Sequence, residues 1–82
     1  MSAAAQRKAN HSLSVAVRHA LARAQGFDTS NVAVKARDGV ITIEGTVPDA
    51  AQIPQATQVA LKVSGVRLVI NHLTVDGGGG GG

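Results

Sequence analysis

The acidic residues of this sequence are too scattered to predict an acid–base site. There are five carboxylates, spread over most of the chain: Asp28, Asp38, Glu44, Asp49 and Asp76. A catalytic carboxylate pair needs both groups within about 5–9 Å in one cleft, and no spacing here predicts such a pair. The chain also has no cysteine, and no serine has an evident histidine partner. These observations favour a protein that is not an enzyme.

The three histidines show no metal-binding pattern. His11 and His19 lie eight residues apart and His72 is near the end of the chain, so no two are one helical turn apart. We expect solvated histidines, no metal site and no cofactor. A cation held only by backbone carbonyls leaves no signal in the sequence, and that possibility stays open.

Composition limits the chain to one small domain with an aliphatic core. Of the 82 residues, 44% are hydrophobic and Phe27 is the only aromatic one. The lack of cysteine excludes a disulfide scaffold, an iron–sulfur cluster and a cysteine-ligated zinc site. The formal net charge of +3 suits an anionic partner but is far below that of dedicated nucleic-acid binders, so no nucleic acid is expected.

No segment has the pattern of a membrane helix or a secretory leader. The longest apolar runs fall short of the ~20 residues that a span needs, and the first ten residues are followed by no apolar leader segment. We expect no transmembrane segment. The chain is then either cytoplasmic as written or a domain cut from a periplasmic or envelope protein, and its localisation stays open.

Periodicity predicts a helix, a β-hairpin, a second helix and a final strand. From about His11, Leu13, Val17 and Leu21 recur on one helical face, whereas residues 1–10 show no such pattern and are expected to be a flexible lead-in. A second helix is expected to begin near 51–54, because Pro54 lacks an N–H and is tolerated only in a first turn. Residues 66–75 read as the last strand.

The hairpin has a predictable register. Val32, Val34 and Ala36 alternate before Asp38-Gly39, a dipeptide suited to a type I′ turn, and 40–47 alternate after it. A two-residue loop places Val34 opposite Ile43 and Ala36 opposite Ile41, so both apolar phases share one face.

These elements predict an α+β fold of order α-β-β-α-β, a two-layer domain with a three-stranded mixed sheet and two helices on one face. The expected organisation is a lead-in over 1–10, a domain over 11–76 and a disordered glycine tail over 77–82. The sequence does not determine whether the last strand pairs with the first or with the second strand of the hairpin.

Two stretches resemble the BON domain (bacterial OsmY and nodulation) family. VAVKARDGVITIEGTV over 32–47 is similar to the family's first half, and Gly65-Val66-x-x-Val69-x-Asn71-x-Leu73-x-Val75 is similar to its ending. The resemblance covers 13–75. It implies an αββαβ fold without an active site, in a module that associates with phospholipid or cell-envelope surfaces, as in osmotic-stress proteins.

Lys35, Arg37 and His72 are the candidate lipid contacts. All three fall in the outward phase of their strands and give the uncovered sheet face a mild cationic character, which would attract anionic headgroups. The expected partner is therefore an anionic phospholipid surface. The alternative is a protein–protein interaction or small-ligand or cation-sensing domain, with self-association through a sheet edge.

Overall fold

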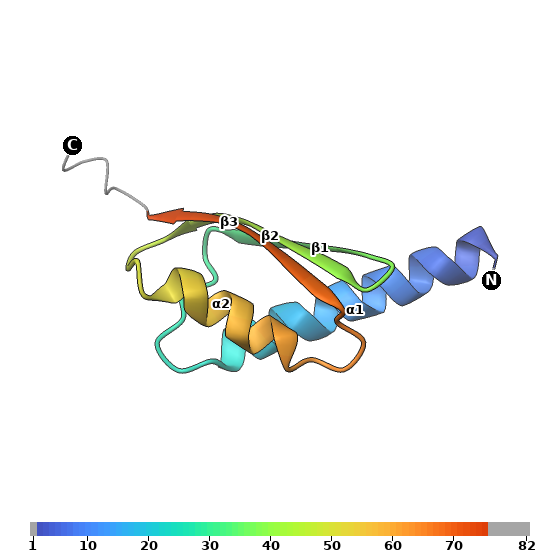
Figure 1. Ribbon diagram of the computed structural model, residues 1–82, viewed down its shortest axis with the longest axis horizontal. Helices are drawn as coiled ribbons and strands as arrows, with labels where there is room; N and C mark the ends of the chain where they lie inside the picture. Colours follow the sequence, from blue (N-terminus) through green and yellow to red (C-terminus); the bar gives the residue numbers. More distant parts are fainter. Residues whose placement is uncertain (1, 76–82) are drawn as a thin grey trace.

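The computed structural model describes residues 2–75, which form five elements in the predicted order (Figure 1). The elements are α1 (Ala3–Arg23), β1 (Val32–Arg37), β2 (Val40–Val47), α2 (Gln52–Leu61) and β3 (Leu68–Val75). The predicted α+β class is confirmed. The glycine tail expected over 77–82 lies outside the described residues.

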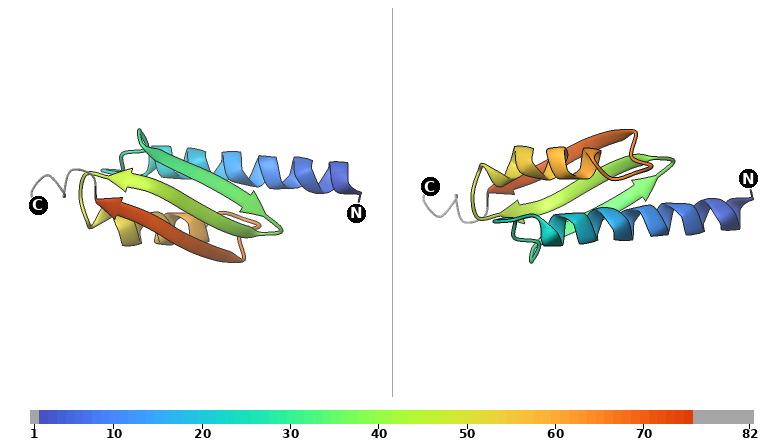
Figure 2. Two further views of the ribbon diagram at one scale, coloured as in Figure 1. Left: turned by 90° about the horizontal axis from the view of Figure 1, so that it is seen from above. Right: turned by 90° about the horizontal axis from the view of Figure 1, so that it is seen from below.

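The molecule has two layers, a three-stranded sheet and a pair of helices on one of its faces (Figures 1 and 2). β2 is the central strand, antiparallel to β1 and parallel to β3. The question that the sequence left open is thus resolved: α2 forms the crossover that brings β3 beside β2. The opposite face of the sheet carries no helix, and we call it the open face.

The hairpin has the register that the alternation predicted. Val34 lies opposite Ile43 and Ala36 opposite Ile41. Asp38 and Gly39 have φ values of 52° and 84°, the two positive values that a type I′ turn requires.

Helix α1 begins at Ala3, eight residues before the predicted start at His11, so that prediction was wrong. The Ser2 hydroxyl caps the helix by accepting from the Ala5 N–H at 3.1 Å, and alanine has the highest intrinsic helix propensity. The first turns project past the sheet (Figure 2), so they bury no apolar stripe and leave no periodic signal. The domain boundaries at residues 11 and 76 stay a prediction.

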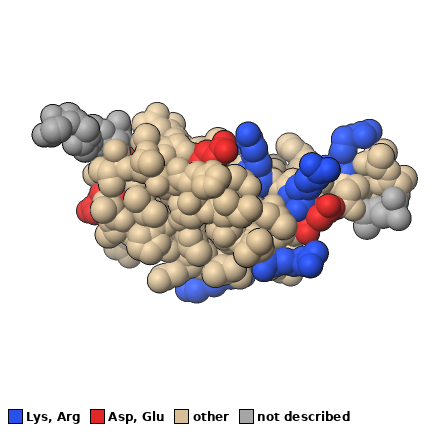
Figure 3. All heavy atoms as spheres, turned by 45° about the horizontal axis from the view of Figure 1, so that its top comes forward, with Lys and Arg blue, Asp and Glu red and all other residues tan. Residues whose placement is uncertain are grey.

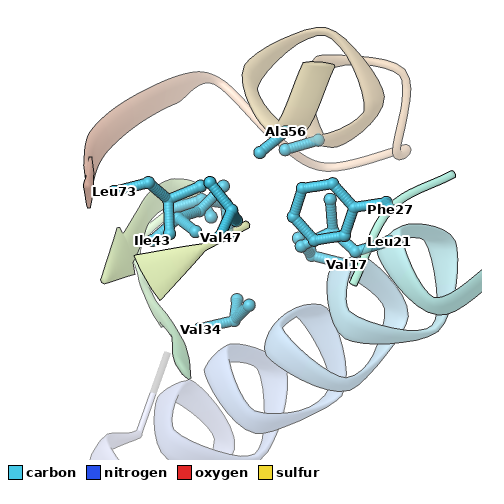
Figure 4. Packing of buried hydrophobic residues seen from close by; sticks show 10 residues of the cluster. Val17, Leu21, Phe27, Val34, Ile43, Val47, Ala56 and Leu73 are labelled. Carbon is cyan, nitrogen blue, oxygen red and sulfur yellow. The ribbon is translucent and has the colours of Figure 1, made fainter. Parts of the chain in front are cut away.

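The core lies between the sheet and the two helices (Figure 4). Val17 and Leu21 of α1 and Ile41, Ile43 and Val47 of β2 are fully buried. Around them pack the following buried residues: Phe27, Val34, Ala56, Ala60 and Leu73. One ring and nine aliphatic side chains make up this cluster, as the composition predicted.

Helix α2 begins at Gln52, which places Pro54 in its first turn. No intrahelical bond is lost there, because the first N–H groups of a helix have no partner within it. Asp49 precedes the helix and accepts from the Ala51 N–H at 2.9 Å. The predicted start is confirmed.

Candidate functional site

Cross-strand pairing arranges side chains from all three strands into three rows on the open face. Arg37, Val40 and Leu68 form the row nearest the hairpin turn. The next row is Lys35, Thr42 and Ile70, and the third is Ala33, Glu44 and His72. Lys35 and Arg37 therefore lie on adjacent rows of β1, whereas His72 lies on the far strand and in the third row.

Glu44 separates two of the three predicted contact residues. Its carboxylate pairs with the Lys35 ammonium at 3.4 Å, and its Cα lies opposite that of His72. The two side chains of the ion pair are 71% and 43% exposed, and exposed pairs of this kind contribute little to stability. Lys35, Arg37 and His72 share a face, but the structure places an acid between Lys35 and His72 instead of one continuous basic patch.

Two large apolar side chains emerge on the same face. Leu68 is 53% exposed and Ile70 is 37% exposed. Leu68 shares the row of Arg37, and Ile70 shares the row of Lys35. Neither was predicted as a lipid contact, although the signal was present, because both share the alternation phase of His72 on the last strand.

A third basic residue is held at the hairpin turn. The Arg67 N–H donates to the Gly39 carbonyl at 2.8 Å, and its guanidinium donates to the Asp38 carbonyl at 3.4 Å. The sequence alone did not connect Arg67 with this site, because the contact depends on where β3 begins. Figure 3 shows Lys and Arg side chains gathered toward the end of the molecule where α1 begins.

The described residues contain no cluster of metal-binding side chains. Within 2–75, no three residues of the His, Cys, Asp and Glu types come together as a metal site would require. The Ser30 hydroxyl, and then the Ser30 backbone N–H at 2.9 Å, hold the pKa of Asp28 below its usual value. That carboxylate is exposed in the loop between α1 and β1, where its hydrogen bonds serve local structure. Neither α1 nor α2 combines the length and apolarity that crossing a bilayer demands.

The sequence model of the BON domain matches residues 10–77. The chain belongs to the BON domain family. A search of the curated proteins found no match. The resemblance on which the sequence expectation rested is therefore confirmed, and the BON match begins seven residues after the first residue of α1.

Two residues of the BON-like pattern have structural tasks in this fold. Gly45, with φ of +126°, packs so closely on β1 that a Cβ there would collide with the Asn31 carbonyl oxygen. Asn71 faces the helices and donates to the Ile53 carbonyl at 2.7 Å. These two motif residues therefore stabilise the BON fold.

Proposed function

We propose that this BON domain is a non-enzymatic binding module that associates with anionic phospholipid surfaces, such as those of a cell envelope under osmotic stress, through its open face. One observation carries the proposal. Exposed Leu68 and Ile70 lie in the same rows as the basic residues Arg37 and Lys35. Side chains of both kinds on one face suit the boundary between headgroups and acyl chains.

Each side chain has a distinct part in this contact. Arg37 and Lys35 attract anionic headgroups, at about 1 kcal/mol for each basic residue near such a surface. Leu68 and Ile70 enter the acyl boundary and remove apolar area from water. His72, opposite Glu44 in the third row, is the remaining contact residue on this face. With so few basic residues, the association is expected to be weak and to decrease with salt.

An NMR titration of the labelled domain tests the proposal. Vesicles of anionic and of zwitterionic phospholipid are added at two salt concentrations. We expect perturbation at Lys35, Arg37, His72 and their neighbours with anionic vesicles alone, and a smaller effect at the higher salt. Perturbation by both vesicle types alike, or on other faces, contradicts the assignment.

A charge-reversed variant sharpens the test. Lys35→Glu combined with Arg37→Glu is expected to abolish vesicle binding. The matched control is Arg18→Glu with Lys62→Glu, which makes the same change of charge at exposed positions in and beside the helices. Equal loss in both variants would show that net charge, and not the open face, governs binding.

The second candidate function is association with another protein or another copy. β1 and β3 are the outer strands of the sheet, and exposed Leu68 and Ile70 lie on β3. Hydrodynamic mass measured without lipid distinguishes headgroup binding from self-association, because self-association raises the mass while headgroup binding leaves it unchanged.

A further inference from the structure

A groove separates α1 from α2 on the side of the helical layer that faces away from the sheet. Its volume is ≈ 600 Å³. Its small and apolar lining, called the floor below, is Ala16 and Ala20 of α1, the C-cap residue Ala24, Val59 of α2 and Val63. The two helices are seen side by side in the view from below (Figure 2). The groove lies on the opposite side of the molecule from the open face, so it is not part of the surface proposed above.

Every ionisable side chain that lines the groove is basic or a histidine. His19 and Arg23 stand one helical turn apart on α1, and Lys62 faces them from the end of α2. All three residues are exposed. Among the described residues, the one ion pair joins Lys35 to Glu44, so Arg23 and Lys62 have no acidic partner there.

The surrounding helical layer is also devoid of acids. Neither α1 nor α2 contains an Asp or Glu, whereas α1 carries four basic residues. The described carboxylates lie in loops, turns and β2: Asp28, Asp38, Glu44 and Asp49. Four of the eight Lys and Arg residues lie on α1 and none lies within α2, and the groove lining offsets its own basic groups with no acid.

We propose that this groove docks an acidic amphipathic helix of a partner protein. A floor of alanines lets a third helix approach closely, and Val59 and Val63 supply apolar contact for its hydrophobic stripe. Basic groups on both sides of the groove match carboxylates on both flanks of that stripe. The alanine and valine side chains of the floor are exposed or only partly buried, so a docked helix would remove part of their apolar surface from water.

Charge complementarity makes the docking selective for acidic partners. Basic groups at the rim of an interface speed encounter with an acidic helix and repel basic ones. The binding is expected to weaken as salt rises, because the rim groups are exposed to solvent. Since the groove and the open face are on opposite sides, one domain can hold the partner helix and a surface at the same time.

A synthetic peptide serves as the probe. It is an amidated and acetylated helix of about 18 residues, roughly 27 Å long, with leucine and alanine on one face and glutamate on the other. One control peptide has glutamine in place of each glutamate, and a second has the same composition in scrambled order. We expect the acidic amphipathic peptide to perturb NMR signals of Ala20, Ala24, Val59 and Val63, and the two controls to have little effect.

Variants of the groove distinguish specific docking from a non-specific attraction of the acidic peptide to the positively charged domain. Arg23→Glu with Lys62→Glu should weaken peptide binding at least about fivefold, whereas Lys35→Glu with Arg37→Glu should leave it unchanged. Ala16→Leu fills the floor and should weaken binding to a similar degree, while Ala22→Leu, exposed on α1 outside the groove, should not. Circular dichroism checks that each variant is folded.

Several outcomes would overturn the proposal. These are equal binding of the glutamine peptide, equal loss with the open-face charge variant, unchanged binding by Ala16→Leu, and perturbations on the sheet instead of the helices. Vesicle binding is measured on the same variants. If the acidic peptide does not bind the groove but vesicle binding is intact, only the groove proposal is rejected. If the peptide binds but the vesicles do not, only the proposed function is rejected.

Discussion

The Asn71 carboxamide on β3 donates to the Thr57 hydroxyl on α2 at 2.8 Å. The same nitrogen donates to the Ile53 carbonyl, and the Asn71 oxygen accepts from the Leu73 N–H at 2.9 Å. One side chain thus joins the edge strand to the helix that covers it. Asn71 lies opposite Ile43 on the helix-covered side, so it takes no part in the open face.

Replacing Asn71 should therefore destabilise the domain without changing its binding. Asn71→Leu keeps the number and branching of the heavy atoms but removes both donated bonds and the accepted one, and we expect a loss of about 1–3 kcal/mol in the free energy of unfolding by urea. A double-mutant cycle with Thr57→Val isolates the pair. Strictly additive effects would show that the hydroxyl contact contributes nothing.

Gly45→Ala should be far more destabilising than Gly26→Ala. Both glycines have positive φ, so both substitutions meet the left-handed backbone penalty of about 1–2 kcal/mol. Only at position 45 would the added Cβ meet a backbone atom, the Asn31 carbonyl oxygen, while the space at 26 is open. Thermal unfolding of the two variants measures the difference, and equal shifts would contradict the close approach of β1 to β2.

Asn10→Ala should loosen the hairpin turn from α1. The Asn10 side-chain oxygen accepts from the Asp38 N–H at 3.0 Å and from the Gln6 amide at 3.1 Å. We expect faster hydrogen exchange at the Asp38 amide, because its acceptor is lost. Gln6→Ala is the control, since it removes only the bond within the helix. The same increase in both variants would show that the turn is not tied through Asn10.

Leu68→Ser should weaken binding to anionic vesicles about fivefold, because the open face then loses one apolar contact of about 1 kcal/mol. The chain offers a close control in Leu61, which is 52% exposed on α2 against 53% for Leu68. Leu61→Ser removes a similar exposed side chain from the other layer. If the two variants lose affinity equally in a sedimentation assay, the open face is not the membrane contact.

Asp28 is expected to titrate below the usual aspartate range. The Ser30 hydroxyl and N–H stabilise its charged form, which lowers its pKa in the folded state relative to the ordinary value of 3.8. The stabilisation is therefore present above about pH 4 and is lost as the pH falls through the folded pKa. Carbon NMR of the carboxyl group measures the value.

The matched variant for that titration is Ser30→Ala. It removes the hydroxyl but keeps the backbone N–H, so the pKa of Asp28 should rise toward 3.8 without reaching it. An unchanged pKa in this variant would assign the effect to the backbone alone.

Much of the fold could be predicted because its signals are local. The alternation on both sides of Asp38-Gly39 predicted the register of Val34 against Ile43, since a two-residue turn leaves only one pairing. Pro54 predicted where α2 begins, because a missing N–H is tolerated only in a first turn. The start of α1 was missed because its first turns extend beyond the core and carry no burial pattern.

The candidate site was predictable in its parts but not in its arrangement. Alternation alone placed Lys35, Arg37 and His72 on the uncovered face. Which residues stand between them depends on the lateral order of the strands, and pairing β3 with β2 placed Glu44 between Lys35 and His72.

By itself, the sequence determined the order of the elements, the hairpin with its turn, the aliphatic character of the core and the resemblance to the BON family. These depend on neighbours along the chain, through backbone preferences and alternating polarity. Only the tertiary structure decided that β3 joins β2, that Leu68 shares a row with Arg37, and that α1 and α2 enclose a groove with basic walls. Those contacts join residues distant in the chain, and they follow from how the sheet and helices pack to bury their common apolar surface.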